Sequence, residues 1–245
     1  MRILALDSSG LVASVAVVED GAVDDQVIAE YTVNYKKTHS QTLLPMLDEI
    51  VKMTELDLKT IDAIAVAKGP GSFTGLRIGS ATAKGLGLAL DKPLVGIPTV
   101  EALAYNLYDV NGLICPIMDA RRKQVYTGIY RYEDHRLVTV KDQMAVGIEE
   151  LLSMLNEMGE SVTFLGDGVP VFKDIIADKL EVPFSFAPAH LSRQRAGAVG
   201  ALGVLYYKEG RTETAAEHKP DYLRVSQAER ERAQKLKKES EGENA

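Results

Sequence analysis

The segment GPGSFTGLRIG, at residues 69–79, has the residue types of a loop that could hold a phosphate group. Gly69 and Gly71 can adopt backbone angles that other residues resist, and Ser72 or Thr74 can cap a helix that follows. The free amide groups at such a helix start attract anions. A glycine turn that only begins a helix would have the same letters, so the segment alone does not establish nucleotide binding.

The helix predicted at 75–90 carries a stripe of small residues. Gly75, Gly79, Ala83 and Gly87 recur every four positions. Each glycine inside a helix costs about 1 kcal/mol relative to alanine, so several of them need a compensating contact. Close approach of another backbone is such a contact, and either this chain's own sheet or helices of another chain could supply it. The spacing leaves both alternatives open.

The histidines and serines do not show the spacing of a metal site or of a nucleophile. The four histidines, His39, His135, His190 and His218, lie far apart and form no HxxxH or HxxH pattern. No serine stands in a recognisable nucleophile motif, so a protease has little support. We therefore expect no metal site in this chain.

The composition indicates a folded protein that does not itself clamp a nucleic acid. The chain of 245 residues is 46% hydrophobic, enough for a large core, and its net charge is −7, with the basic residues scattered except for a cluster at the extreme C-terminus. Proteins that hold RNA normally present a basic face, so we expect contact with RNA only through another subunit. The single Cys115 cannot form an internal disulfide, and no apolar stretch approaches the roughly 20 residues of a membrane helix. A cytoplasmic protein without membrane insertion is expected.

The apolar runs predict an alternation of strands and helices. Their order is strand, strand, strand, helix, strand, helix, strand, at residues 3–6, 12–18, 27–33, 43–53, 63–67, 75–90 and 94–97. A helix at about 100–108 leads to a second series, with strands at 113–118, 125–132 and 137–140, a helix at 148–158 and a strand that ends at Gly166 and Gly168. The element order therefore repeats.

This duplicated α/β plan resembles the actin, Hsp70 and sugar-kinase superfold (ASKHA), in which two lobes face each other across a cleft. It predicts a first lobe at 1–108, a second lobe at 109–225 and a charged, mobile tail at 226–245. In kinases and ATPases of this superfold the residue that matches Asp7 handles a metal-bound phosphate, whereas the alternative is an ordinary turn in which Asp7 accepts bonds from local amides. The residues for which the resemblance suggests nucleotide contacts are Asp7, Ser8, Ser9, Gly69, Gly71 and Gly166.

Longer runs of letters carry a closer resemblance. THSQTLLPMLDEIV at 38–51, IDAIAVAKGPGSFTGLRIGSATAKGLGLALDKPLVGIPTVEALA at 61–104 and KPDYLRVSQAE at 219–229 closely resemble the bacterial TsaB (YeaZ) family, with similar order and spacing over nearly all of residues 1–227. The resemblance implies an accessory role beside a catalytic paralogue, TsaD, and an ATPase, TsaE. Together they place a threonylcarbamoyl group on the adenosine next to the anticodon of tRNAs that read codons beginning with A.

Comparison with the TsaD-like paralogues bears on the chemistry. Those proteins continue the shared segment with a histidine pair that holds a metal ion, and this chain has Thr99 and Leu103 at the two positions, on either side of Glu101. Leucine offers no donor atom, so metal-assisted activation is not available at these positions. The resemblance thus implies that the chain contributes no catalytic residue and no metal.

The helices at 43–53 and 75–90 are the expected face for the TsaD-like partner. The proposed contact residues are Leu44, Leu47, Val51, Gly75, Gly79, Ala83 and Gly87. The same face would form a two-fold homodimer in isolation, and ATP or ADP could bind at the partner interface. On this interpretation, Ala83→Leu would prevent association and leave the fold intact.

An independent phosphotransferase is the alternative from the enzyme class, because the superfold includes many small-molecule kinases. It requires an adenosine pocket in the second lobe, for which only Gly166, Asp167 and Gly168 are candidates. A purely regulatory or cell-wall-associated activity has no residue-level support.

Overall fold

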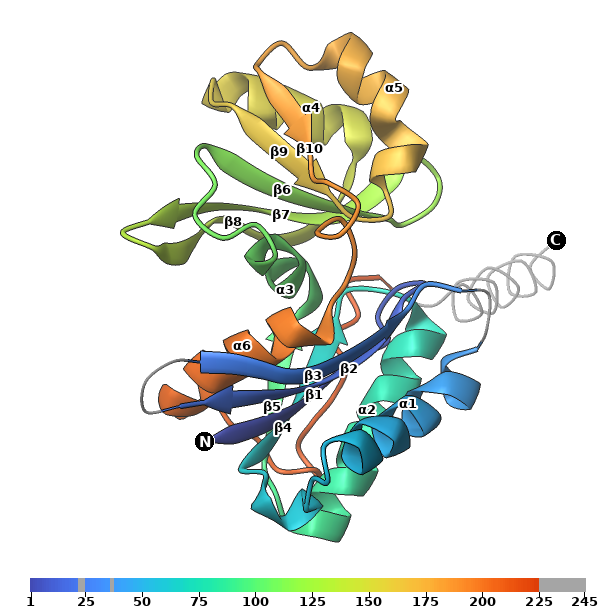
Figure 1. Ribbon diagram of the computed structural model, residues 1–245. Helices are drawn as coiled ribbons and strands as arrows, with labels where there is room; N and C mark the ends of the chain where they lie inside the picture. The colour runs from blue at the N-terminus through green and yellow to red at the C-terminus, as the bar shows by residue number, and fades with distance from the viewer. Residues whose placement is uncertain (22–24, 36–37, 225–245) are drawn as a thin grey trace, which may run out of the picture.

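The computed structural model describes residues 1–21, 25–35 and 38–224, which form two lobes, each built on one five-stranded sheet (Figure 1). The predicted tail at 226–245 lies outside the described residues. Among the residues that are described, no helix combines the length and the apolar character that crossing a membrane requires.

The first sheet has the predicted meander and crossover. Its strands are β1 (Arg2–Asp7), β2 (Ala13–Asp20), β3 (Asp25–Val33), β4 (Ala63–Gly69) and β5 (Leu94–Pro98), in the order β3-β2-β1-β4-β5. The first three strands are antiparallel neighbours, whereas β4 and β5 continue the sheet in parallel with β1. Parallel strands of this kind need a helical crossover, which explains why helices precede β4 and β5.

The second sheet repeats the order of the first. Its strands are β6 (Leu113–Asp119), β7 (Gln124–Glu133), β8 (Arg136–Gly147), β9 (Val162–Leu165) and β10 (Phe184–Phe186), in the order β10-β9-β6-β7-β8. Again three antiparallel strands are followed by two that run parallel to the first of them. The duplication expected from the sequence is therefore present in the topology.

Helices cover the sheets on the faces that their apolar residues require. On the first sheet, α1 (His39–Met53) and α2 (Phe73–Leu90) cover one face and α6 (Ala196–Lys208) covers the other, and a 3-10 turn, η1 (Leu58–Thr60), leads into β4. On the second sheet, α4 (Ile148–Met158) and α5 (Val169–Lys179) pack on one face. The short α3 (Thr99–Tyr105) lies between the two sheets (Figure 1): Ala102 packs with the first sheet, whereas Val100, Leu103 and Ala104 pack with the second.

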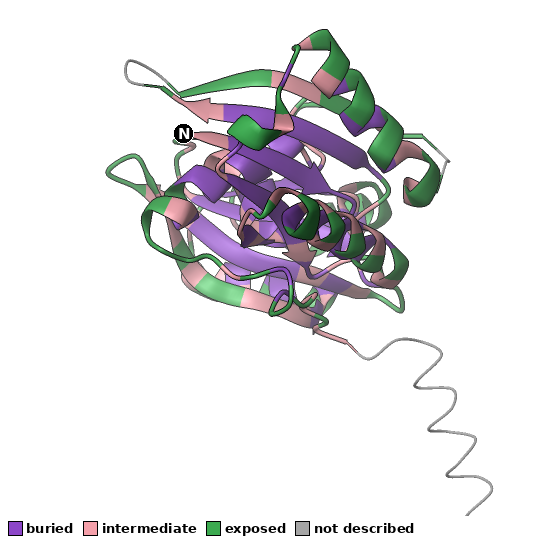
Figure 2. Cartoon of the chain, turned by 90° about the horizontal axis from the view of Figure 1, so that it is seen from below, coloured by how far each residue is buried: buried purple, intermediate pink, exposed green. Residues whose placement is uncertain are grey.

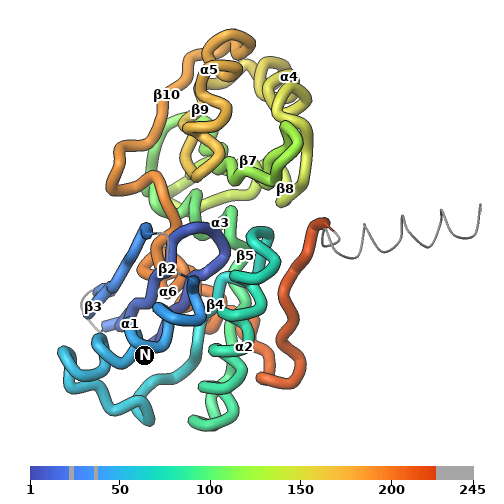
Figure 3. Tube along the Cα trace, turned by 90° about the vertical axis from the view of Figure 1, so that its right-hand side faces the viewer, coloured from blue at the N-terminus to red at the C-terminus, as the bar shows by residue number. Residues whose placement is uncertain are grey.

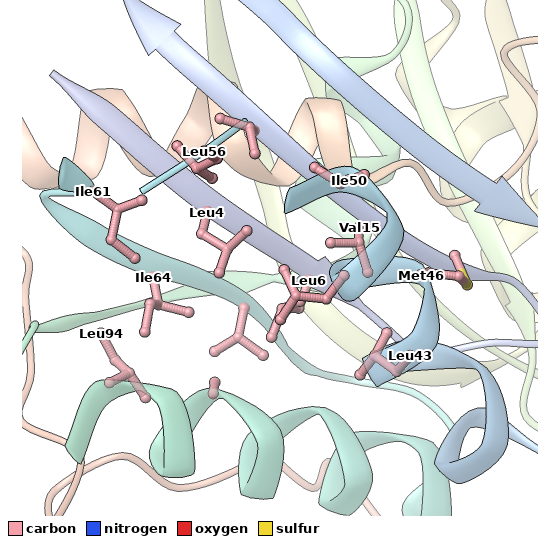
Figure 4. Close-up of a cluster of buried hydrophobic side chains, with 14 of the residues drawn as sticks. Leu4, Leu6, Val15, Leu43, Met46, Ile50, Leu56, Ile61, Ile64 and Leu94 are labelled. Atoms are coloured by element: carbon pink, nitrogen blue, oxygen red, sulfur yellow. The ribbon is translucent and has the colours of Figure 1, made fainter. Parts of the chain in front are cut away.

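The core of the first lobe follows from helical spacing in α1. Leu43, Met46, Leu47 and Ile50 are buried and face the side chains of β1, β2 and β4 (Figure 4). Burying each such side chain contributes about 1.5–3 kcal/mol. The inner strands of both sheets are mostly buried, whereas exposed residues lie on the edge strands β3, β8 and β10 and on the outer sides of the helices (Figure 2).

Two helix starts differ from the predicted positions. Helix α1 begins at His39, four residues before the predicted start, and Thr38 precedes it without a side-chain cap. Helix α2 begins at Phe73, and its cap is Ser72, whose hydroxyl accepts from the Gly75 amide at 3.3 Å. Both segments contain several serines and threonines that could cap a helix, so the local sequence does not decide at which of them the helix begins.

The last described part of the chain returns to the first lobe. Helix α6 packs on β1, β2 and β4, although the predicted division placed everything from 109 to 225 in the second lobe. Gly200 and Gly203 explain the close fit, because a Cβ at either position would press into side chains of β1, β2 or β4. Packing thus assigns α6 and the segment after it to the first lobe, a long-range relation that the local pattern did not show.

Candidate functional site

The start of α2 is joined to the first hairpin loop by hydrogen bonds. The Ser72 amide donates to the carbonyl of Ser9 at 2.7 Å, and the Ser8 hydroxyl donates to the carbonyl of Gly75 at 2.9 Å. Ser8 and Ser9 are almost completely buried. Part of the amide edge that a phosphate would need is therefore already bonded to the chain's own backbone.

Close contacts within the chain explain the glycines of this region. A Cβ on Gly71 would collide with the backbone oxygen of Ser9, and one on Gly75 would collide with that of Ser8. Gly69, with a φ of +127°, lies beneath the carbonyl of Asp221. Close packing of three backbone segments accounts for the glycine loop without a ligand.

The small-residue stripe of α2 also faces inward, which corrects the predicted partner interface. A Cβ on Gly79 would lie 2.5 Å from the Ser8 hydroxyl and one on Gly87 would lie 2.5 Å from a Leu94 methyl group, while Ala83 is 0% exposed. Gly75 and Leu47 are buried as well. The spacing left open whether the small residues contact this chain's own sheet or helices of another chain. In the structure they contact this chain's own sheet and first hairpin.

A different set of residues lies on the solvent side of the two helices. Leu44 is 55% exposed and Leu88 is 72% exposed. Ala81 and Gly85 are exposed, and Val51 and Ile78 are half-buried. Helices α1 and α2 lie side by side on the same side of the sheet (Figures 1 and 3). We refer to Leu44, Val51, Ile78, Ala81, Gly85 and Leu88 as the α1–α2 outer face.

Gly85 is the unusual member of this face. An added Cβ there would meet no atom of the described residues within 4 Å, in contrast to the inward glycines. A glycine in the middle of an exposed helix costs about 1 kcal/mol, and nothing in the described part of the chain compensates for it. The signal was visible in the sequence, because positions 78, 81, 85 and 88 have helical spacing, but the inner stripe concealed it.

A cleft of about 470 Å³ lies between the lobes. Ser9 and Gly71 from the predicted nucleotide set line it, whereas Asp7, Ser8, Gly69 and Gly166 do not. The full lining is Ser9, Gly10, Leu11, Gly71, Ser72, Phe73, Met118, Asp119, Ala120, Arg121, Tyr126, Asp167, Val171, Tyr222, Leu223 and Arg224. Most predicted nucleotide contacts are thus behind the cleft wall.

Asp7 lies in an ordinary turn, as the alternative interpretation predicts. Its Oδ1 accepts from the amide of Ser9 at 2.8 Å and from its hydroxyl at 2.6 Å. Burial raises the pKa of Asp7 to about 6 despite these bonds. Gly166, with a φ of +106°, lies against the carbonyl of Ile117 and is likewise explained by local geometry.

Asp119 connects two other charged residues that line the cleft, Asp167 and Arg121. The Asp119 amide donates to Asp167 Oδ1 at 3.2 Å, and Asp119 also forms an ion pair with Arg121 at 3.2 Å. Burial raises the pKa of Asp167. In the described ranges no group of three or more histidine, cysteine or acidic side chains is placed to hold a metal.

The two positions that match the metal ligands of TsaD-like proteins are part of the core. Thr99 is 0% and Leu103 is 1% exposed, and Leu103 packs with Ile114 and Leu165 of the second sheet. Between them in the sequence, Glu101 accepts a hydrogen bond from the Tyr206 hydroxyl at 2.6 Å, and burial raises its pKa. Glu101 borders a second, larger cavity of about 1000 Å³ on α3, β8 and α6.

One constellation was not predicted. Ser80 lies 3.0 Å from His218 Nε2, and His218 Nδ1 lies 2.7 Å from Glu213 Oε1, an arrangement that resembles a hydrolase triad. Ser80 is 4% and His218 is 1% exposed, and neither lines the cleft or the second cavity. The three residues therefore fasten the segment after α6 onto α2. Their separation in the sequence left no local signal.

The comparisons with known proteins decide the family. The sequence profile of the family described as "TsaD: tRNA N6-adenosine threonylcarbamoyltransferase" matches residues 26–232. A curated relative from Bacillus subtilis (strain 168), the tRNA threonylcarbamoyladenosine biosynthesis protein TsaB, is 37% identical over 229 residues, which cover 94% of this chain and 96% of the relative. This chain belongs to the TsaB family. The predicted family is confirmed.

Solved structures confirm the predicted superfold. The structure described as YeaZ from Pseudomonas aeruginosa matches with a TM-score of 0.76 and 24% identity, covering 91% of this chain and 99% of that one. A polyphosphate/ATP-glucomannokinase from Arthrobacter sp. strain KM matches with a TM-score of 0.50 and 12% identity, over 84% and 99% of the two chains. At these identities the likeness concerns the fold alone, so it brings no kinase activity to this TsaB family member.

Proposed function

We propose that this chain is the non-catalytic partner subunit of a tRNA threonylcarbamoyltransferase and binds the catalytic subunit through the α1–α2 outer face. Its TsaB relatives are named for tRNA threonylcarbamoyladenosine biosynthesis, and the family profile that it matches is named for the transferase itself. The role in tRNA modification rests on this family membership, and the division of labour rests on the residues described above.

The first support comes from Thr99 and Leu103, the residues at the positions that match the metal ligands of TsaD-like proteins. Thr99 lacks an imidazole, and Leu103 is packed between the lobes. A metal at this place would need donor atoms in a water-accessible or substrate-accessible space, which this core does not offer. The chemistry of threonylcarbamoyl transfer is therefore assigned to the partner.

The observation that carries the interface is Gly85. It is exposed, lies inside the helix and has no atom of residues 1–21, 25–35 or 38–224 against its Cβ position, and it lies in a row with Ile78, Ala81 and Leu88. A glycine in an apolar helix face allows the backbone of a second helix to approach closely, which offsets its cost to the isolated helix.

The homology of α1 and α2 to a segment of the transferase family indicates the partner. The matched range, 26–232, includes both α1 and α2, so the transferase family contains a related segment. Two related helix pairs can pack about a pseudo-two-fold axis, with each pair presenting the same face. The same geometry would allow this chain to form a homodimer when no transferase is present. The proposal also includes a TsaE-like ATPase as a second partner and ATP or ADP bound at the partner interface. It assigns tRNA binding to the transferase and places the complex in the cytoplasm.

The test is association with the TsaD-like subunit of the same organism, measured by isothermal titration calorimetry. Ala81→Arg places a long charged side chain on the outer face, and we expect the affinity to fall by at least about tenfold. Ala177→Arg is the matched control, because Ala177 is also an exposed helical alanine but lies on α5. Unchanged affinity of a folded Ala81→Arg variant would refute the proposed interface.

A further inference from the structure

The two lobes are connected by the chain twice. The first crossing runs through α3, and the second runs through residues 187–195, which lead from β10 to α6. Asn106 and Arg193 stabilise the second crossing, because the Asn106 side chain donates to the carbonyls of Leu191 and Arg193, and Arg193 donates to that of Gly166. These two crossings are the covalent connections between the lobes, and we refer to them as the hinge.

A third connection between the lobes is made by non-covalent contacts. Residues 212–224, which we call the C-terminal strap, leave α6 and run along α2 toward the second lobe (Figure 3). The strap begins with a bridge to β5, in which the amides and carbonyls of Glu213 and Leu94 pair at 2.8 and 2.9 Å. The Ser80, His218 and Glu213 contacts and the bond from Lys84 to the His218 carbonyl at 3.1 Å hold its middle.

The far end of the strap touches both lobes. The Asp221 amide donates to the carbonyl of Lys68 in the first lobe at 2.6 Å, and the Tyr222 ring stacks near Phe73 with 4.7 Å between ring centroids. On the other side, the Gln143 side chain of β8 donates to the Asp221 carboxylate. The Arg224 guanidinium donates to the carbonyl of Ala120, in the loop after β6, at 2.6 Å.

The position of these contacts matters as much as their number. Asp221 and Gln143 line the second cavity, whereas Tyr222 and Arg224 line the cleft. The strap therefore passes between the two interlobe spaces. A rotation of the lobes that widened the cleft would have to separate Arg224 from Ala120 or Asp221 from Gln143.

We propose that the C-terminal strap is a latch that holds the two lobes at one fixed angle. Two-lobed proteins with hinges of this kind commonly open and close around a ligand, and the latch restricts that motion in this chain. The anchors on the first lobe are backbone pairs and buried side chains, so the releasable contacts are the two on the second lobe. The latch is a property of the isolated chain and does not depend on the proposed partner.

The test measures the distance between the lobes directly. Spin labels are attached to cysteines introduced at Lys59 and Asp178, two exposed positions on the first and second lobe. The native Cys115 does not compete, because it is completely buried and burial raises its pKa to about 12. Pulsed electron paramagnetic resonance then gives the distribution of distances in the full chain.

The variant Gln143→Ala/Arg224→Ala removes both contacts with the second lobe and touches no core residue. We expect its distance distribution to broaden and shift relative to wild type. Each single variant keeps one contact and should broaden less. Arg121→Ala is the matched control, since Arg121 lines the same cleft but pairs with Asp119 of its own lobe, and its distribution should match wild type. An unchanged distribution in the double variant, with native circular dichroism, would overturn the proposal.

Discussion

Asp7 has a carboxyl group in a place that offers it almost no water. It is 1% exposed, its Oδ1 is bonded to Ser9, and its Oδ2 has no partner in the described structure. Burial raises its pKa from 3.8 to about 6. The buried site thus favours the neutral acid more than water does, which works against a role as a phosphate-handling metal ligand.

Asp7 should make the chain less stable as the pH rises from about 4 to about 6. In this window the folded state binds more protons than the unfolded state, so the free energy of unfolding falls with pH. The shift from 3.8 to about 6 corresponds to about 3 kcal/mol. Asp7→Asn keeps the acceptor for Ser9 and should remove this dependence, as urea unfolding of both proteins across the pH range would reveal. Parallel stability curves for the two proteins would refute the assignment.

The glycines of α2 should respond with opposite signs. Gly75→Ala forces a Cβ against the Ser8 backbone oxygen, which cannot move away easily, and should cost about 1–3 kcal/mol. Gly85→Ala adds a Cβ in open space and should stabilise the isolated chain by about 1 kcal/mol. Denaturant unfolding measures both. Equal effects on stability would mean that the inner and outer sides of α2 have been wrongly assigned.

At the scale of elements, α2 joins three parts of the molecule. Its start bonds the first hairpin, its inner face packs on the sheet, and Ser80 near its middle holds the C-terminal strap. Its outer side alone is free of such contacts among the described residues. Contrary to the sequence-based expectation, we predict that Ala83→Leu disturbs the fold, because Ala83 is completely buried and a larger side chain would overpack the core.

The resemblance of Ser80, His218 and Glu213 to a hydrolase triad should not extend to reactivity. Ser80→Ala leaves His218 Nε2 without its partner in a buried place and should lower stability by about 1–3 kcal/mol. The wild-type chain should show no labelling by a fluorophosphonate probe, since Ser80 is buried and lines neither the cleft nor the second cavity. Labelling of wild type that disappears in Ser80→Ala would contradict a purely structural role.

At the scale of the whole molecule, the sequence predicted what depends on local repetition. The duplicated order of elements and the amphipathic spacing of α1 were visible because strands and helices have short periods. The orientation of the small-residue stripe was not visible, because Ser8, which fills the space beside Gly75 and Gly79, is 67 residues away from Gly75. The predicted division of the lobes missed the return of α6 and the strap to the first lobe for the same reason: the contacts join residues far apart in the sequence.

The central claim is that this chain acts through a surface and not through its cleft. Reconstituted threonylcarbamoyl transfer to tRNA, with the transferase and ATPase of the same organism, tests it most directly. Two variants are compared with wild type: Asp119→Asn/Asp167→Asn, which neutralises the two acids that line the cleft and keeps an acceptor atom at each position, and Ala81→Arg on the outer face. We expect the cleft variant to support transfer at a near wild-type rate and Ala81→Arg to support little. Loss of transfer in a cleft variant that still binds the transferase would contradict the account.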